Sequence, residues 1–225
     1  MHYNQYPSGW NGFSTLSDFY SKFEASDVRR GTAYPTNSSV YTNPGKRVNV
    51  GFLVGQQYDL KTDAPLKDRT GAPLVFTPEV NIIEKGTNLE RTGIRAYKYA
   101  IDYPNVDNGL WDNDYVYFRL ADVMLMKAEA LLRNGQAGPA ATIVNQVRQN
   151  RGATQLGTVT LDNMIDERGR ELYLESWRRQ DMIRFGKFLL PRIQKPQTSD
   201  QKYLLFPIPN GQLAANPNLT QNPGY

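Results

Sequence analysis

Apolar side chains recur with the period of an α-helix near the start of the stretch from Asp114 to Phe188. A polar stripe lies on the other side of the same helix, where it can meet water or ion-pair partners. It consists of Arg119, Asp122, Glu129 and Arg133 and is interrupted only by Met126. The apolar positions follow the i, i+3, i+4, i+7 spacing of a helix with one buried face, and they are 117, 120, 121, 124, 128 and 131. We therefore predict a helix that is buried along this apolar face.

A second helix is predicted directly after the first. Asn134 and Gly135 tolerate the left-handed backbone that ends a helix, and Pro139 suits the first turn of the next one. The apolar face of this second helix consists of Ala140, Ile143, Val144 and Val147. Two helices joined so closely form an antiparallel hairpin of about 34 residues, which is the size of one tetratricopeptide unit.

A third helix is predicted from the cap at Thr160 to about Ser176, with Leu161, Ile165 and Leu172 facing inward. Its charged side chains are spaced for ion pairs along the helix, and they are Glu167, Arg168, Glu171, Glu175 and Arg178. Carboxylates and guanidinium groups this close can also shift one another's pKa values, as they do in active sites. We favour structural ion pairs over an active site for this group.

The first 113 residues contain few regular patterns. Ser14 is a good cap for a short helix whose apolar face consists of Leu16, Phe19, Tyr20 and Phe23. Short strands are predicted at 48–54, 74–76, 80–83 and 94–99. The chain is thus expected to be mainly α with long irregular loops, one tetratricopeptide-like helical hairpin, further helices and a few short β-strands. We expect a loop-rich, ligand-binding part at 1–113, a helical scaffold at 114–188 and an extended tail at 189–225.

Composition removes several classes of function. The chain of 225 residues has no cysteine and a single histidine, His2, which excludes disulfides, cysteine nucleophiles, a histidine triad and a multi-histidine metal site. No run of about 18 apolar residues occurs, and the first residues do not resemble a signal peptide. The 26 basic residues are interspersed with 22 acidic ones, so the net charge of +4 does not indicate a nucleic-acid partner. We expect no cofactor, no metal and no nucleic acid.

Three motifs resemble one known family. Residues 167–188 resemble the charged helical signature of SusD/RagB proteins. Residues 118–130 resemble the family's earlier helix, which has the pattern R-x-A-D/E-V-x-L-x-x-A-E-A. The end of the chain, at 205–209 and 216–225, resembles the family's characteristic close. The motifs stand in the family's order and cover essentially the whole chain, so the chain is identified as a member of this family.

The resemblance implies a non-enzymatic, Bacteroidetes-type nutrient-binding protein of the outer membrane. Such proteins are surface lipoproteins that capture glycans, or sometimes peptides, and cover a SusC-like TonB-dependent transporter. Family members usually carry an export signal, a lipid-bearing cysteine and several tetratricopeptide-like hairpins in an N-terminal half. This chain resembles the C-terminal half alone, and we expect the missing N-terminal half to be a partner, because one hairpin cannot bury both of its faces.

The candidate glycan site lies near the start of the chain. The ring face of a sugar stacks on aromatic side chains, while its hydroxyls pair with amides and carboxylates. We predict Trp10 and Tyr6 as stacking groups, with Tyr3 beside them, and the hydroxyl partners are predicted to be Asn4, Gln5 and Asn11. The resemblance agrees with this region, though not residue by residue. Alternatively, Trp10 packs its loop onto the body of the protein. Trp111 is a weaker candidate, for which we favour packing.

Two other functions remain open from the residues alone. The hairpin can belong to a tetratricopeptide-like scaffold that binds proteins and no glycan. A glycoside hydrolase would need a pair of carboxylates, such as Asp112 with Asp114 or Asp102 with Asp107. The same loop has oxygen ligands of the kind that Ca²⁺ prefers, although their spacing is not that of an EF-hand.

Overall fold

The computed structural model describes residues 2–5, 8–33, 48–59, 62, 64–80, 83, 89–99, 101–102, 105 and 111–225. The chain forms two compact units, Met1–Ser176 and Trp177–Tyr225, and each is described by itself. Three predictions involve residues outside the described ones: the site residue Tyr6, the carboxylate Asp107 and the strand at 80–83.

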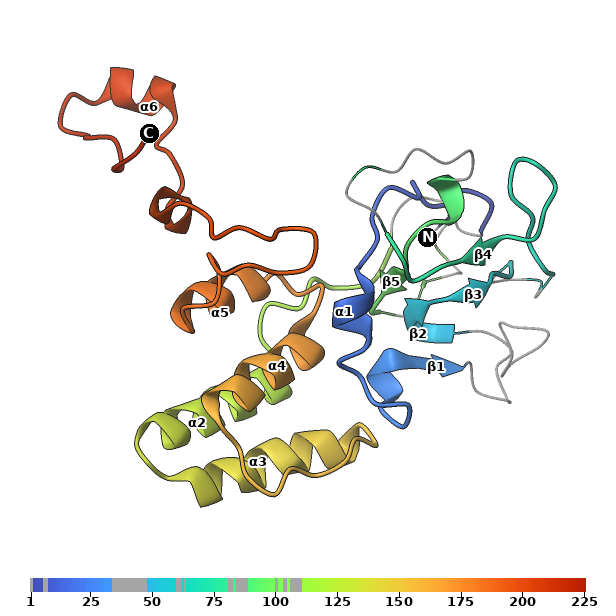
Figure 1. Cartoon of the computed structure of the whole chain (residues 1–225), viewed down its shortest axis with the longest axis horizontal. Helices are drawn as coiled ribbons and strands as arrows, with labels where there is room; N and C mark the ends of the chain where they lie inside the picture. Colours follow the sequence, from blue (N-terminus) through green and yellow to red (C-terminus); the bar gives the residue numbers. More distant parts are fainter. Residues whose placement is uncertain are drawn as a thin grey trace. The chain divides into compact units, whose positions relative to one another are not determined.

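The first unit contains two small antiparallel sheets (Figure 1). In the larger sheet, β2 (Val48–Leu53) pairs with β1 (Gly31–Ala33) on one side and with β5 (Arg95–Tyr97) on the other. The smaller sheet consists of β3 (Gly55–Gln56) and β4 (Val75–Phe76). Strands are therefore present within three of the four predicted segments, and they are short, as expected.

Gly51 shows how tightly the larger sheet is built. It faces Gly31 across the β1–β2 pair, and its φ of 117° lies in the region that favours glycine. A Cβ atom on Gly51 would lie 2.7 Å from the Cα atom of Gly31. Only glycine fits this position without a shift of the backbone.

Aromatic side chains form the core next to the sheet. Phe23, Phe52, Ile94 and Tyr173 are buried together, and Phe19 packs against them. The rings of Phe52 and Tyr173 stack with their centroids 5.2 Å apart, while Phe23 meets Phe52 edge to face at 5.0 Å. Because Tyr173 directly follows the observed helix Leu161–Leu172, this core joins the loop-rich part of the unit to its helices.

The helical hairpin is confirmed. The helices α2 (Leu120–Arg133) and α3 (Ala137–Asn150) lie side by side, and α4 (Leu161–Leu172) packs against α2 (Figure 1). Asn134 follows α2 and Gly135 has a φ of 75°, as the stop signal predicts. The Thr160 side chain accepts a hydrogen bond from the Asn163 backbone, and Asn163 caps Thr160 in return.

The predicted buried face of α2 is correct only in part. Ala128 is completely buried as predicted, but Tyr117 and Leu120 are exposed, and Leu125, which is not on the predicted face, is completely buried. The buried face includes Asp122, whose carboxylate receives a hydrogen bond from Arg168 of α4 at 3.1 Å. A buried carboxylate paired with arginine replaces an apolar contact here, so a pattern of apolar residues alone places the face incorrectly.

Two helix boundaries and the exposure of one residue also differ from the prediction. The helix α1 (Ser17–Tyr20) begins after Leu16, so Ser14 does not cap it. The helix α4 ends at Leu172 instead of Ser176, because Leu174 and Ser176 adopt positive φ angles of 60° and 65° that no helix continues through. Leu161 is partly exposed because it occupies the first position of α4, whereas Ile165 and Leu172 are buried as predicted.

The second unit contains α5 (Arg178–Arg184), the 3₁₀ helix η4 (Gln201–Leu204) and α6 (Asn210–Ala215). Two 3₁₀ helices also occur in the first unit, η1 (Val28–Arg30) and η2 (Leu89–Arg91). The tail, which the sequence predicts to be extended, therefore includes two helical turns within this unit.

Candidate functional site

The loop that contains the predicted glycan site is held in place by its polar side chains. The buried Gln5 accepts a hydrogen bond from the His2 backbone at 2.9 Å and donates one to Gln57 at 3.3 Å. Asn11 donates to the Glu90 carbonyl at 2.9 Å and accepts from Arg95 at 3.0 Å. These two amides are engaged within the protein, so their direct effect is to fix the conformation of the loop.

Trp10 is the most exposed large apolar side chain of this loop, with 91% of its surface accessible. Packing of Trp10 onto the body of the protein is therefore excluded. Phe13, three positions later, is also highly exposed, and Asn4 lies on the surface with its amide bonded to the Lys67 carbonyl at 3.0 Å. An uncovered indole ring between two residues whose amides are hydrogen-bonded within the protein, Gln5 and Asn11, has the form of a stacking platform.

A charged cluster beneath the loop fixes Tyr3. The Tyr3 hydroxyl donates to the carboxylate of Glu90, which also receives hydrogen bonds from the Arg69 backbone at 2.8 Å and the Arg69 side chain at 3.1 Å. Burial opposes ionisation of Glu90, but these donors outweigh it and lower its pKa to about 2. The buried His2 ring lies 3.9 Å from the Tyr3 ring, and burial lowers the pKa of His2. Tyr3 is thus held by its hydroxyl, with part of its ring exposed.

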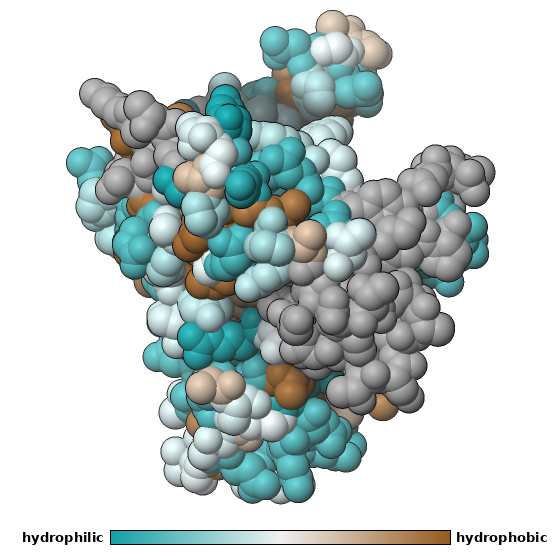
Figure 2. Space-filling model, turned by 90° about the vertical axis from the view of Figure 1, so that its right-hand side faces the viewer, coloured by the Kyte–Doolittle hydropathy of each residue, from teal (hydrophilic) through white to brown (hydrophobic). Residues whose placement is uncertain are grey.

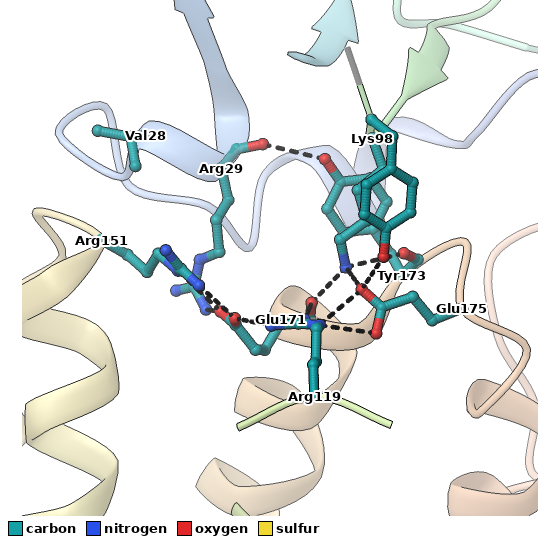
Figure 3. Close-up of a pocket in the computed structure, with 9 residues that line it drawn as sticks. Val28, Arg29, Lys98, Arg119, Arg151, Glu171, Tyr173 and Glu175 are labelled. Carbon is teal, nitrogen blue, oxygen red and sulfur yellow. Dashed lines mark hydrogen bonds and ion pairs between the residues drawn. The ribbon is translucent and has the colours of Figure 1, made fainter. Parts of the chain in front are cut away.

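The first unit also has a cavity of about 340 Å³ beside α4 (Figure 3). Its cationic side chains come from four different places in the chain: Arg29 from η1, Lys98 after β5, Arg119 before α2 and Arg151 after α3. The other lining residues are Val28, Tyr99, Glu171, Tyr173 and Glu175. The cavity therefore lies where the larger sheet meets the helices α2, α3 and α4.

Glu171 is the centre of this cavity's ion-pair network. Its carboxylate is 1% exposed and contacts three arginines: Arg29 at 2.9 Å, Arg119 at 2.6 Å and Arg151 at 2.8 Å. In Figure 3 these side chains converge on Glu171 from different elements. Burial opposes ionisation, but the hydrogen bonds and charges of Arg151 and Arg119 lower the pKa of Glu171 to about 2.

Lys98 is the one side chain in the cavity with a pKa near neutrality. Burial lowers its pKa to about 8, although hydrogen bonding and attraction to Glu175 oppose the change. Its ammonium group donates to the carbonyls of Glu171 and Tyr173 and pairs with Glu175. All three of its N–H donors are thus engaged, so Lys98 is arranged as a structural cation.

The charged residues of the third predicted helix are structural, but not in the expected way. Glu167 pairs within the helix with Arg170 at 2.6 Å, and with Arg29 and Arg148 from other elements, both at 2.7 Å. The partners of Glu171 also come from other elements. The spacing along α4 predicts only the Glu167–Arg170 type of pair. The distant arginines leave no local signal, because Arg29 is 142 positions away from Glu171.

Of the described carboxylates proposed for hydrolysis, Asp112 and Asp114 are exposed and Asp102 is partly exposed. The carboxylate of Asp102 accepts hydrogen bonds from the Asp112 backbone at 2.9 Å and from the Asn105 side chain at 3.0 Å, and these bonds lower its pKa. Within the described ranges, no group of three or more His, Cys, Asp or Glu residues is arranged to hold a metal ion. Trp111 beside this loop is 49% exposed.

Comparison with known proteins identifies the family. The SusD family model matches residues 2–192, well over half of the chain. This chain belongs to the SusD family. The family predicted from the sequence is therefore confirmed, with the motifs at 118–130 and 167–188 inside the matched range, and so is the mainly helical fold with few short strands.

Two relatives in the SusD family illustrate the extent of the similarity. The chain is 37% identical over 142 residues to the starch-binding protein SusD of Bacteroides thetaiotaomicron, which covers 59% of this chain and 25% of that protein. It is 30% identical over 159 residues to SusD-like protein P38 of Formosa agariphila, which covers 64% of this chain and 30% of that protein. The chain thus matches between a quarter and a third of the length of these relatives.

Solved structures support the SusD fold. A SusD-like protein of Bacteroides fragilis superposes with a TM-score of 0.64 at 22% identity, covering 96% of this chain and 48% of that one. A SusD superfamily protein of Parabacteroides distasonis has a TM-score of 0.60 at 25% identity, covering 94% and 42%. Among the described residues, no helix has the length and apolar character needed to span a membrane.

Proposed function

We propose that this chain belongs to a non-catalytic glycan-binding protein and that it binds glycan through the loop around Trp10. The observation that supports this site is the 91% exposed indole on a loop fixed by hydrogen bonds of Gln5 and Asn11. A preformed aromatic surface binds sugar rings at low entropic cost, because little has to become ordered. The name of the starch-binding relative, 37% identical over 142 residues, supports a saccharide ligand.

In this proposal the residues of the loop have different roles. Trp10 supplies the stacking face, with Tyr6 as a second stacking group, while Tyr3 borders the site. Asn4, on the surface, is placed to meet hydroxyl groups. Gln5 and Asn11, whose amides already bond to Gln57 and Glu90, contribute mainly by fixing the loop.

Replacing Trp10 by alanine is expected to weaken saccharide binding at least about tenfold, because a central aromatic contact is lost. Isothermal titration with maltoheptaose is the first measurement, followed by a panel of neutral oligosaccharides. Trp111→Ala is the matched control, since it removes a second exposed tryptophan outside the loop. If Trp10→Ala binds as tightly as the unaltered chain, or if Trp111→Ala alone loses binding, the proposed site is wrong.

We further propose that the bound glycan is delivered to a SusC-like TonB-dependent transporter at the outer-membrane surface, where the longer protein is lipid-anchored. Membership of the SusD family supports this proposal. Co-purification of the two proteins from one cell, and uptake assays with the Trp10→Ala variant, would test it. Normal uptake by that variant would contradict delivery from this site.

A second candidate function is favoured by exposed apolar side chains at the start of α2. Tyr117 and Phe118 directly before the helix, and Leu120 and Val123 in its first turn, each have more than half of their surface exposed. Exposed apolar side chains grouped in this way are typical of a protein-binding surface, as expected of a tetratricopeptide-like scaffold or of contact with an N-terminal half. This candidate predicts that Leu120→Glu abolishes protein association, measured by analytical ultracentrifugation, while no saccharide binds.

The surface in Figure 2 is seen after a turn of 90° from the view of Figure 1. Its coloured residues are mainly hydrophilic, and the hydrophobic residues stand in small groups.

A further inference from the structure

The excess positive charge of the chain lies in its second unit. Residues 177–225 contain seven Lys and Arg residues and two acidic ones, Asp181 and Asp200, for a net charge of +5. The remaining 176 residues contain 19 basic and 20 acidic side chains, for a net charge of −1. A field of one sign over so short a segment attracts anions.

Some of these basic side chains line a cavity of about 340 Å³ within this unit. Three cations line it, Arg179, Arg192 and Lys195, and no acidic side chain does. The cavity in Figure 3 has the same volume, but there Glu171 and Glu175 pair with the cations. The two acidic side chains of the second unit are engaged elsewhere. Asp181 pairs with Arg184 at 2.8 Å, and Asp200 accepts from the Lys202 backbone at 2.8 Å.

The hydrogen-bond partners of the three cations are neutral. Arg179 donates to the Tyr203 carbonyl at 3.0 Å, and Arg192 donates to the Phe188 carbonyl at 2.6 Å. Lys195 donates to the carbonyls of Leu189 and Gln197, both at 3.1 Å, and to the Ser199 hydroxyl at 3.0 Å. Carbonyl and hydroxyl oxygens orient these cations without neutralising them, and none of the three forms a salt bridge within the described part of the chain. Their charge remains available to an anion.

Aromatic rings hold the central guanidinium in the cavity. The Arg179 guanidinium lies 4.1 Å from the centroid of the Phe206 ring and 5.0 Å from that of Phe188. Phe206 is 69% exposed, and Tyr203 is about half exposed. An aromatic surface next to fixed cations combines the two chemistries that a charged sugar requires: a face for its C–H groups and donors for its anionic group.

We propose that this cationic aromatic cavity, defined by Arg179, Arg192, Lys195, Phe188, Phe206 and Tyr203, binds the carboxylate or sulfate group of an acidic glycan. The inference rests on the proposed glycan-binding function and adds a ligand class to it. Arg192 supplies N–H donors that meet the anion, and Lys195, whose three N–H donors are already engaged, adds its positive charge beside them. Arg179 adds a donor held near two rings, and the exposed ring of Phe206 receives the sugar face.

The test is isothermal titration of the full chain with three oligosaccharides of equal length: one neutral, one built of uronic acids and one sulfated. We expect the acidic ligands to bind at least tenfold more tightly than the neutral one in 50 mM NaCl, and this advantage to shrink in 500 mM NaCl. The two acidic ligands separate carboxylate from sulfate recognition. Equal affinity for neutral and acidic ligands would overturn the inference.

The variants locate the effect. Arg192→Gln with Lys195→Gln is expected to lose at least tenfold in affinity for the acidic ligands and less than twofold for the neutral one. The conservative variant Arg192→Lys keeps the charge and is expected to retain most of the affinity. Lys67→Gln with Lys127→Gln removes the same charge from exposed positions of the first unit and serves as the matched control. An equal loss in that control would overturn the inference, because net charge alone would then explain binding.

The outcomes also separate this inference from the proposed function. Binding of neutral sugars through Trp10, without any preference for acidic ones, contradicts only the cavity's assignment. If no saccharide of any kind binds, the proposed function fails and the inference fails with it. An acidic peptide such as hexaglutamate is included as a competitor. If it displaces the acidic saccharide at equal concentration, the cavity is a site for acidic peptides and the inference is overturned.

Discussion

Replacing Glu171 by glutamine is expected to lower the free energy of unfolding by about 3–5 kcal/mol, because it removes a buried negative charge that three arginines share. The Glu171 carboxylate is 1% exposed and lies within 2.9 Å of Arg29, Arg119 and Arg151. Glutamine has nearly the same shape, but its amide carries no charge and presents an N–H group to donors. The arginines cannot move to water freely, since they also bond to Asp27 and Glu175.

Chemical denaturation followed by circular dichroism measures this effect, because the helices α2 to α4 lie in the same unit as Glu171. The matched control is Glu79→Gln, which makes the same chemical change at an exposed carboxylate. Its free energy of unfolding should change by no more than about 0.5 kcal/mol. Equal effects of the two substitutions would show that the Glu171 network does not stabilise the fold as its geometry indicates.

The local parts of the fold could be predicted from the sequence because their causes are local. The cap at Thr160 depends on Asn163 three positions later, and the stop at Asn134 and Gly135 depends on the backbone preference of those residues. The orientation of α2 could not be predicted in this way. It depends on the pairing of Asp122 with Arg168, which lies in another helix.

The candidate sites likewise combine features that the sequence predicts with features that only the structure shows. An aromatic residue among amides near the start of the chain is visible in the sequence, but only the structure distinguishes the exposed Trp10 from the buried Gln5 beside it. The network of Arg29, Arg119 and Arg151 around Glu171 joins residues far apart in the chain, so a single sequence contains no spacing that predicts it. The charged cavity of the second unit cannot be predicted from the sequence for the same reason. Its cations become a group only when α5 and the tail fold together.

Acidification is expected to destabilise the first unit between about pH 4.5 and pH 2. The pKa of Glu171 falls from 4.5 to about 2 in the folded chain, and the pKa values of Glu167 and Glu175 are also lowered. For each, burial opposes ionisation but nearby cations outweigh it. The unfolded chain therefore binds more protons in this pH range. The stabilisation is fully present above the pKa of the unfolded chain and is lost as the pH falls through the pKa of the folded chain. Glu171 alone contributes roughly 3 kcal/mol to it.

Urea denaturation at pH 7, 5, 4 and 3 measures this loss, and a variant of one partner connects it to Glu171. Arg151 is 36% exposed, so Arg151→Gln removes one donor from Glu171 with less risk to the fold than a change of the carboxylate itself. Loss of that donor raises the folded pKa of Glu171 and moves the acid midpoint to higher pH. Lys127→Gln removes a charge from an exposed position of α2 and should leave the midpoint unchanged. If both variants unfold at the same pH as the unaltered chain, the acid sensitivity arises outside the Glu171 network.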